Sequence, residues 1–134
     1  MDQPAYDSLI VNLFGGPGVG KSTTAAHIFA ELKWKEISTE LVTEYVKGKV
    51  HEESYKTLEH QIYVFGKQLH YVKRAAEHVD VVVQDASLLN SLIYERERTT
   101  GLFKNFVWDE YTRFNNLNVY IERDHPYDPT GRYH

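Results

Sequence analysis

The sequence contains no cysteine, and this absence removes several kinds of chemistry at once. Disulfides, thiolate metal centres and cysteine nucleophiles are therefore excluded. Long apolar runs are also missing: no segment approaches the ~18 consecutive apolar residues of a membrane helix. The polar and acidic segment from Met1 to Asp7 does not resemble a signal peptide. We therefore expect a cytoplasmic protein in a reducing compartment, with no membrane partner.

An excess of positive charge is missing too. The chain carries 15 Lys and Arg against 19 Asp and Glu, a net charge of −4. Nucleic-acid binding depends on cations that neutralise phosphates, so nucleic acid is not an expected partner. With 134 residues, of which 42% are hydrophobic, the composition is that of one ordinary folded domain spanning residues 1–134.

Short apolar segments alternate with amphipathic ones along the chain. Strands are predicted at 9–14, 41–43, 79–85 and 117–121. Helices are predicted at 22–34, 58–76, 87–97 and 103–115, and the second of these has apolar residues at intervals of three and four. Alternation of this kind predicts an α/β fold in three layers, a parallel sheet flanked by helices.

A glycine-dense segment separates the first predicted strand from the first predicted helix. It reads Gly15-Gly16-Pro17-Gly18-Val19-Gly20-Lys21-Ser22 and fits the pattern G-x-x-x-x-G-K-[ST] in full. Glycines let backbone N–H groups converge on one anion, and the start of the following helix adds positive potential. Lys21 is expected to bridge the β- and γ-phosphates, and the Ser22 hydroxyl to ligate Mg²⁺. We expect the nucleotide to be bound by Gly15, Gly16, Pro17, Gly18, Val19, Gly20, Lys21, Ser22 and Thr23.

With this motif in this context, the chain resembles the P-loop NTPase superfamily. The resemblance implies the three-layer P-loop fold and binding of ATP or GTP with Mg²⁺. The sequence has no convincing guanine-reading segment of the Asn/Thr-Lys-x-Asp type, which favours ATP.

Asp85 ends the third predicted strand. In an open α/β sheet the carboxyl ends of the strands line the ligand site, so this carboxylate can hold the Mg²⁺ shell or act as a base. The alternative is that Asp85 caps the helix expected near Ser87. ATPases often have a second acidic residue here, whereas this chain has Ala86. The pattern Asp85-Ala86-Ser87 therefore resembles the kinase-like branch of the superfamily.

Further segments resemble nicotinamide riboside kinase-like domains and bacteriophage ATPase/kinase domains of AAA type. They are Thr43-Glu44-Tyr45, the helix around Glu59-His60-Gln61, the strand that ends at Asp85, and the tail from Arg123 to Arg132. Glu44 would then bind a substrate hydroxyl or act as a base, the alternative being a solvated carboxylate. Gln61 would read a base or amide edge, unless it belongs to an ordinary polar helix face.

The tail at 122–134 contains two prolines and a glycine and is predicted to be a loop. In kinase-like relatives a lid at this place supplies arginines that neutralise the transferred phosphoryl group, a role that falls here on Arg123 and Arg132. The alternative is an exposed loop in which these arginines pair with Asp124 or Asp128. Such relatives usually continue beyond the lid, so the fold is expected to be short at its C-terminus, and a second copy or a partner protein would cover the missing surface.

The leading functional hypothesis is a magnesium-dependent transferase. It would move the γ-phosphoryl group of ATP to a small hydroxyl acceptor, namely a nucleoside, a nucleotide or a nicotinamide riboside-like compound, with Lys21, Asp85, Arg123 and Arg132 as catalytic residues. One alternative is a nucleotide-binding regulatory or interaction protein with little turnover. Another is an ATPase that needs no acceptor.

Overall fold

The computed structural model describes residues 3–16, 19–43, 57–93 and 101–122, except for the side chains of 57–61 and 93. The elements follow one another as β1 (Leu9–Phe14), α1 (Lys21–Trp34), β2 (Thr39–Val42), α3 (Thr57–Ala76), β3 (Val81–Gln84), α4 (Asn90–Ile93), α5 (Gly101–Tyr111) and β4 (Asn115–Tyr120).

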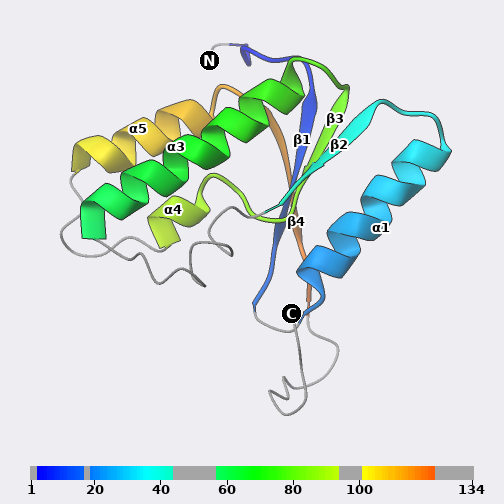
Figure 1. Cartoon of the computed structure of the whole chain (residues 1–134), viewed down its shortest axis with the longest axis horizontal. Coiled ribbons are helices and arrows are strands. Elements are labelled where there is room, and N and C mark those ends of the chain that lie inside the picture. The colour runs from blue at the N-terminus through cyan, green and yellow to red at the C-terminus, as the bar shows by residue number, and fades with distance from the viewer. Residues whose placement is uncertain (1–2, 17–18, 44–56, 94–100, 123–134) are drawn as a thin grey trace.

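The four strands form one parallel sheet in the order β2-β3-β1-β4. Leu9 of β1 lies opposite Val81 of β3 on one side and Asn115 of β4 on the other. Figure 1 shows α1 on one face of the sheet and α3, α4 and α5 on the other. The predicted three-layer α/β architecture with a parallel sheet is therefore confirmed.

Two apolar clusters fill the space between the layers, because successive strand residues point to opposite faces of the sheet. The smaller cluster packs under α1 and is centred on Val11, Leu13, Ala25 and Val83. The larger cluster packs under α3 and α5 and includes Ile10, Val42, Phe65, Val72, Val82, Val107 and Phe114. Strands buried on both faces are expected for a parallel sheet that carries helices on each side.

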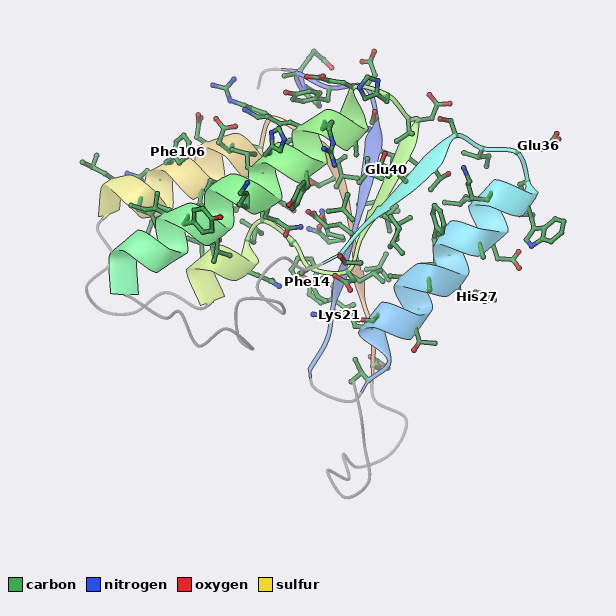
Figure 2. All side chains as sticks on the ribbon, in the orientation of Figure 1. Phe14, Lys21, His27, Glu36, Glu40 and Phe106 are labelled. Carbon is green, nitrogen blue, oxygen red and sulfur yellow. The ribbon has the colours of Figure 1, made fainter. Side chains whose placement is uncertain are left out.

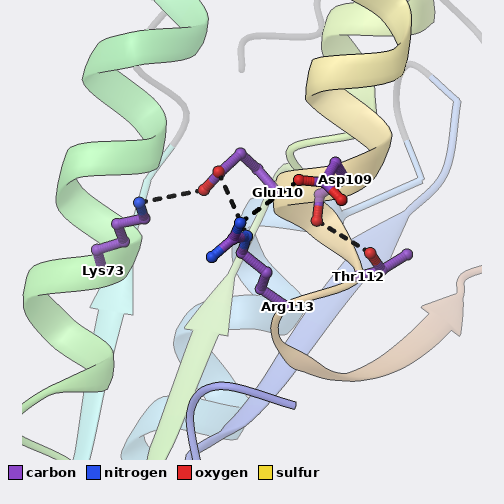
Figure 3. Close-up of polar contacts among 5 residues, drawn as sticks. All are labelled: Lys73, Asp109, Glu110, Thr112 and Arg113. Carbon is purple, nitrogen blue, oxygen red and sulfur yellow. Dashed lines mark hydrogen bonds and ion pairs between the residues drawn. The ribbon is translucent and has the colours of Figure 1, made fainter. Parts of the chain in front are cut away.

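An ion pair joins α3 to α5, and two more lie at the end of α5 (Figure 3). Lys73 Nζ lies 3.1 Å from Glu110 Oε1, and Arg113 Nε lies 3.5 Å from Glu110 Oε2. Arg113 also approaches Asp109 at 3.6 Å, and Thr112 Oγ1 donates to the Asp109 carbonyl at 2.9 Å. Glu110 is buried, and a buried carboxylate requires opposite charge nearby. The cations therefore allow this acidic residue to lie at the seam between the two helices.

Several predicted boundaries were wrong. The helix predicted to reach residue 115 ends at Tyr111, because Asn116 Nδ2 donates to the Tyr111 and Phe114 carbonyls and β4 already begins at 115. The helix predicted from residue 87 begins at Asn90, after a turn in which the Ser87 hydroxyl accepts from the Leu89 amide at 3.0 Å. Its predicted end at 94–97 lies outside the described residues.

The second strand also differs from its prediction. It runs from 39 to 42, whereas the apolar pattern predicted 41–43. Thr39 is buried and its hydroxyl donates to the Ile37 carbonyl at 2.8 Å. Because this hydrogen bond satisfies the hydroxyl, a polar residue can begin a buried strand. The pattern of apolar residues in the sequence does not indicate such a start.

The connections of the sheet determine where a ligand can bind. From β1 the chain passes through α1 to β2 on one side, and from β3 it passes through α4 and α5 to β4 on the other side. The strand order therefore reverses between β1 and β3, which are neighbours. Ligands of open α/β sheets bind at the carboxyl ends of the strands at such a reversal. No described helix is both long and apolar enough to cross a membrane.

Candidate phosphate-binding site

The loop between β1 and α1 turns tightly at the carboxyl edge of the sheet. A Cβ atom added at Gly15 would lie 2.6 Å from Val19 Cγ2 and 3.5 Å from the Ile121 carbonyl oxygen. A Cβ atom at that distance would force the Val19 side chain to shift, whereas glycine requires no such shift. Gly20 ends the loop with φ at +85°, a left-handed conformation that other residues rarely adopt. Two of the glycines in the motif are thus required by the shape of the loop.

Helix α1 begins at Lys21, directly after Gly20. The N-cap residue, Gly20, makes no side-chain cap hydrogen bond, and the first turn of α1 contains no acidic residue that would offset the positive end of the helix dipole. Figure 2 shows Lys21 at the start of α1, near Phe14 at the end of β1, whereas His27 and Glu36 lie farther along and beyond the helix. This end of α1 is suited to attract an anion.

Asp85 follows β3 at the same edge of the sheet and is 2% exposed. Ser22 Oγ donates a hydrogen bond to Asp85 Oδ2 at 3.1 Å, across 63 residues of sequence. The turn toward α4 is closed by Ser87, so the carboxylate lies against the first turn of α1 and the alternative of a simple helix cap loses support. The fold thus joins a hydroxyl and a carboxylate at the reversal of strand order.

These oxygen atoms fit the chemistry of a magnesium ion bound with a nucleotide. Mg²⁺ prefers oxygen ligands and is usually held by one or two protein groups together with phosphates and water. Among the described residues there is no group of three or more His, Asp or Glu that could form a separate metal cage. Ser22 and Asp85, next to the glycine-rich loop, provide the small ligand set that such an ion needs.

The other predicted site residues are only partly covered by the structure. Gly16 and Val19 lie in the loop, and Thr23 is in the first turn of α1. Gln61 lies in α3, but its side chain is not described. The remaining predicted residues, Pro17, Gly18, Glu44, Arg123 and Arg132, lie outside the described residues.

A buried amide network behind the site was missed by the sequence interpretation. Gln68 of α3 donates to Gln84 Oε1 at 3.1 Å, and Gln84 donates to Asn12 Oδ1 at 2.7 Å. Asn12 then donates to Asn116 and Asn118 of β4 at 3.0 and 3.1 Å. The sequence contains a signal for this network, because Asn12, Gln84 and Asn118 each interrupt a predicted strand. Which amides pair with one another depends on the strand order.

Together, the glycine-rich loop before α1 and the carboxylate at the end of the neighbouring strand define a P-loop NTPase. The chain belongs to the AAA domain family, whose model matches residues 10–132. The P-loop fold and nucleotide binding expected from the sequence are therefore supported by family membership. A comparison with curated proteins gives no match.

Two solved structures share the fold. The crystal structure of APE1195 is 18% identical, with a TM-score of 0.57 over 87% of this chain, and the chain spans 62% of its length. The APS kinase CysC of Mycobacterium tuberculosis, solved as a mutant, is 14% identical, with a TM-score of 0.56 over 95% of this chain and 84% of the other. At such identities the likeness concerns the fold.

Proposed function

We propose that this protein transfers the γ-phosphoryl group of ATP to a small hydroxyl acceptor, such as a nucleoside, a nucleotide or a nicotinamide riboside-like compound. The observation that carries the proposal is the contact between Ser22 Oγ and Asp85 Oδ2 at the end of the glycine-rich loop. It brings together one hydroxyl and one carboxylate where the terminal phosphates of a bound nucleotide would lie. The kinase-like fold adds support, as does Ala86 after Asp85, where many ATPases have an acidic residue.

Each residue has a stated role in this proposal, and Asp85 has two. The loop amides and Lys21 would bind the β- and γ-phosphates, and Ser22 and Asp85 would hold Mg²⁺. The ion, when bound, offsets the negative charge of the phosphates. As the acceptor oxygen bonds to the γ-phosphorus, the bond to the β,γ-bridging oxygen breaks, and the hydroxyl proton passes to the Asp85 carboxylate. ADP and the phosphorylated acceptor leave.

Four further residues are assigned by the sequence pattern alone. Arg123 and Arg132 neutralise the transferred group from a lid at 122–134, which also excludes water. Glu44 and Gln61 bind the acceptor. Glu44 follows β2, two strands from β1 in the sheet, so the acceptor would lie on the β3–β2 side of the phosphates.

An ATPase that needs no acceptor is the second candidate, because the family is described as an AAA domain. The two functions are separated by measuring ADP release from ATP and Mg²⁺ with and without a panel of nucleosides, nucleotides and nicotinamide riboside. Release that depends on an acceptor supports the transferase. Equal release without any acceptor contradicts it and supports the ATPase, and nucleotide binding without release supports a regulatory protein.

The matched substitutions are Lys21→Ala and Lys33→Ala, at the two ends of α1. Lys21→Ala should lower turnover by about 10²–10³-fold, the loss typical for removing one group that stabilises transition-state charge. Lys33→Ala should leave turnover unchanged, since Lys33 lies three helical turns away, beside the ring of Phe29. Equal rates for the wild type and Lys21→Ala would rule out the proposed site.

A further inference from the structure

The buried amide network lies directly behind the proposed magnesium ligands. Gln84 and Asp85 are consecutive residues at the end of β3, and consecutive strand residues point to opposite faces of the sheet. Asp85 meets Ser22 on the α1 face, whereas Gln84 meets Asn12 and Gln68 on the face that α3 covers. Gln84, the residue before Asp85, is therefore held by hydrogen bonds on the face of the sheet opposite to the Asp85 carboxylate.

Polar residues at these positions are unexpected for a parallel sheet, whose central strands are usually apolar on both faces. Asn12 and Gln84 are each 1% exposed, and Gln68 is 7% exposed. Burying an amide is unfavourable unless its hydrogen bonds are made, and apolar side chains of similar size would avoid that cost. Stability alone therefore does not explain why three amides occupy this part of the core.

The network also reaches the end of β2. Gln68 Nε2 lies 3.4 Å from the Thr43 carbonyl oxygen in addition to its bond with Gln84, and the Asp85 amide donates to the Val42 carbonyl at 3.3 Å. One side chain of α3 is thus bonded to the ends of both β2 and β3. On the other side, Asn12 ties β1 to β4 through Asn116 and Asn118. The network therefore links all four strands, from the carboxyl ends of β2 and β3 to Asn116 near the start of β4.

We propose that Gln84, held by Asn12 and Gln68, is a positioning residue that fixes the Asp85 carboxylate against Ser22 for magnesium binding. Directional hydrogen bonds select one arrangement of the strand end, whereas apolar packing allows several arrangements of similar energy. Groups behind a metal ligand commonly control its affinity in this way. The inference rests on the proposed role of Ser22 and Asp85 in binding magnesium.

The test measures ADP binding by calorimetry, once with Mg²⁺ and once with EDTA, together with Mn²⁺ binding by electron paramagnetic resonance. Gln84→Leu should weaken binding of Mn²⁺ and the magnesium-dependent part of ADP binding by about tenfold, the lower end of the range for partners of metal ligands. Binding of ADP in EDTA should not change, because the loop and Lys21 remain. Equal Mn²⁺ affinity in Gln84→Leu and the wild type would overturn the inference.

A second set of variants separates positioning from stability. The triple variant Asn12→Leu, Gln68→Leu, Gln84→Leu replaces three of the five amides of the network by apolar groups, so it should melt above Gln84→Leu and still bind Mn²⁺ weakly. If its Mn²⁺ affinity equals that of the wild type, the amides serve packing alone and the inference is wrong. If Gln84→Leu does not fold, Gln68→Met takes its place in the test. It removes the Gln68 amide, keeps an unbranched side chain in α3 and should also weaken Mn²⁺ binding.

Ser8→Ala is the matched control, because Ser8 is a buried hydrogen-bonding residue at the opposite edge of the sheet. Its hydroxyl contacts the Ala76 and Val79 carbonyls at 2.7 and 2.5 Å. It should lower the melting temperature and leave Mn²⁺ affinity unchanged; an equal loss of affinity would show that any buried polar defect weakens the metal site. Failure of the wild type itself to bind Mg²⁺ with ADP would instead refute the proposed function, so the two failures are distinguishable.

Discussion

The two faces of the sheet differ in what they contribute. The α1 face has a small apolar cluster, and at its carboxyl edge Lys21, Ser22 and Asp85 gather around the glycine-rich loop. The α3 and α5 face has the larger cluster, stacked aromatic rings, the ion pairs of Glu110 and the amide network. The comparison indicates that one face carries most of the proposed chemistry while the other supplies most of the stability and supports the site from behind.

The largest expected effect on stability comes from Phe114, which is 3% exposed and stacks on Tyr6 with ring centroids 4.8 Å apart. Phe114→Ala should lower the free energy of unfolding by about 3–5 kcal/mol, the usual cost of truncating a buried phenylalanine. Urea denaturation measures this loss. The residue lies before β4, at the amino edge of the sheet, so ADP affinity should stay within about twofold, as for distant independent sites.

Phe114→Leu is the control, because it keeps an apolar side chain and should cost less than about 1.5 kcal/mol. A large loss of ADP affinity in folded Phe114→Ala would contradict the division between the two faces, since it would mean that packing at the amino edge controls the site at the carboxyl edge.

A smaller effect is expected at the seam between α3 and α5. Lys73→Met removes the cation nearest to the buried Glu110 carboxylate, and among the described residues Arg113 remains as its ion-pair partner. Because the Lys73 side chain is 37% exposed, we expect a loss of about 1–2 kcal/mol, between the values for exposed and buried pairs. Thermal unfolding at low and high salt measures it. The double substitution Lys73→Met, Glu110→Gln should recover part of the loss; no recovery would show that Lys73 acts through its packing.

The smallest effect concerns the α1 side, at the turn into β2. Glu36 has φ at +62°, a left-handed conformation that is unfavourable for a residue with a side chain. Glu36→Gly should raise the free energy of unfolding by about 0.5–1 kcal/mol, measured by chemical denaturation. Glu36→Ala removes the same charge and keeps the strain, so it should give no gain; an equal gain in both variants would identify charge as the cause.

Much of this architecture could be predicted from local sequence. The apolar run before the glycines predicted β1, the spacing of apolar residues predicted α3, and alternation of strands and helices predicted the parallel sheet. Element ends were less predictable, because hydrogen bonds of Thr39, Ser87 and Asn116 determine where β2, α4 and α5 begin or end. A sequence pattern contains the residue types but not these partners.

The residues of the candidate site also differ in how far the sequence alone predicts them. The loop motif identified Lys21 and Ser22 without any structure, because the shape of the loop is encoded in consecutive residues and glycine alone tolerates it. The place of Asp85 at a strand end predicts a metal or catalytic role but leaves helix capping open, and the hydrogen bond from Ser22 favours the first role. Glu44, Gln61, Arg123 and Arg132 remain predictions.

The amino-acid sequence alone therefore determined the phosphate-binding loop, the helix that follows it and the alternating pattern of the α/β fold, since each depends on residues close together in the chain. The order β2-β3-β1-β4 depended on tertiary structure, and this order places Gln84 between Asn12 and Gln68 and brings Asp85 to Ser22. The physical reason is distance along the chain: hydrogen bonds across 16 to 72 residues form only when the sheet assembles, so no local pattern encodes them.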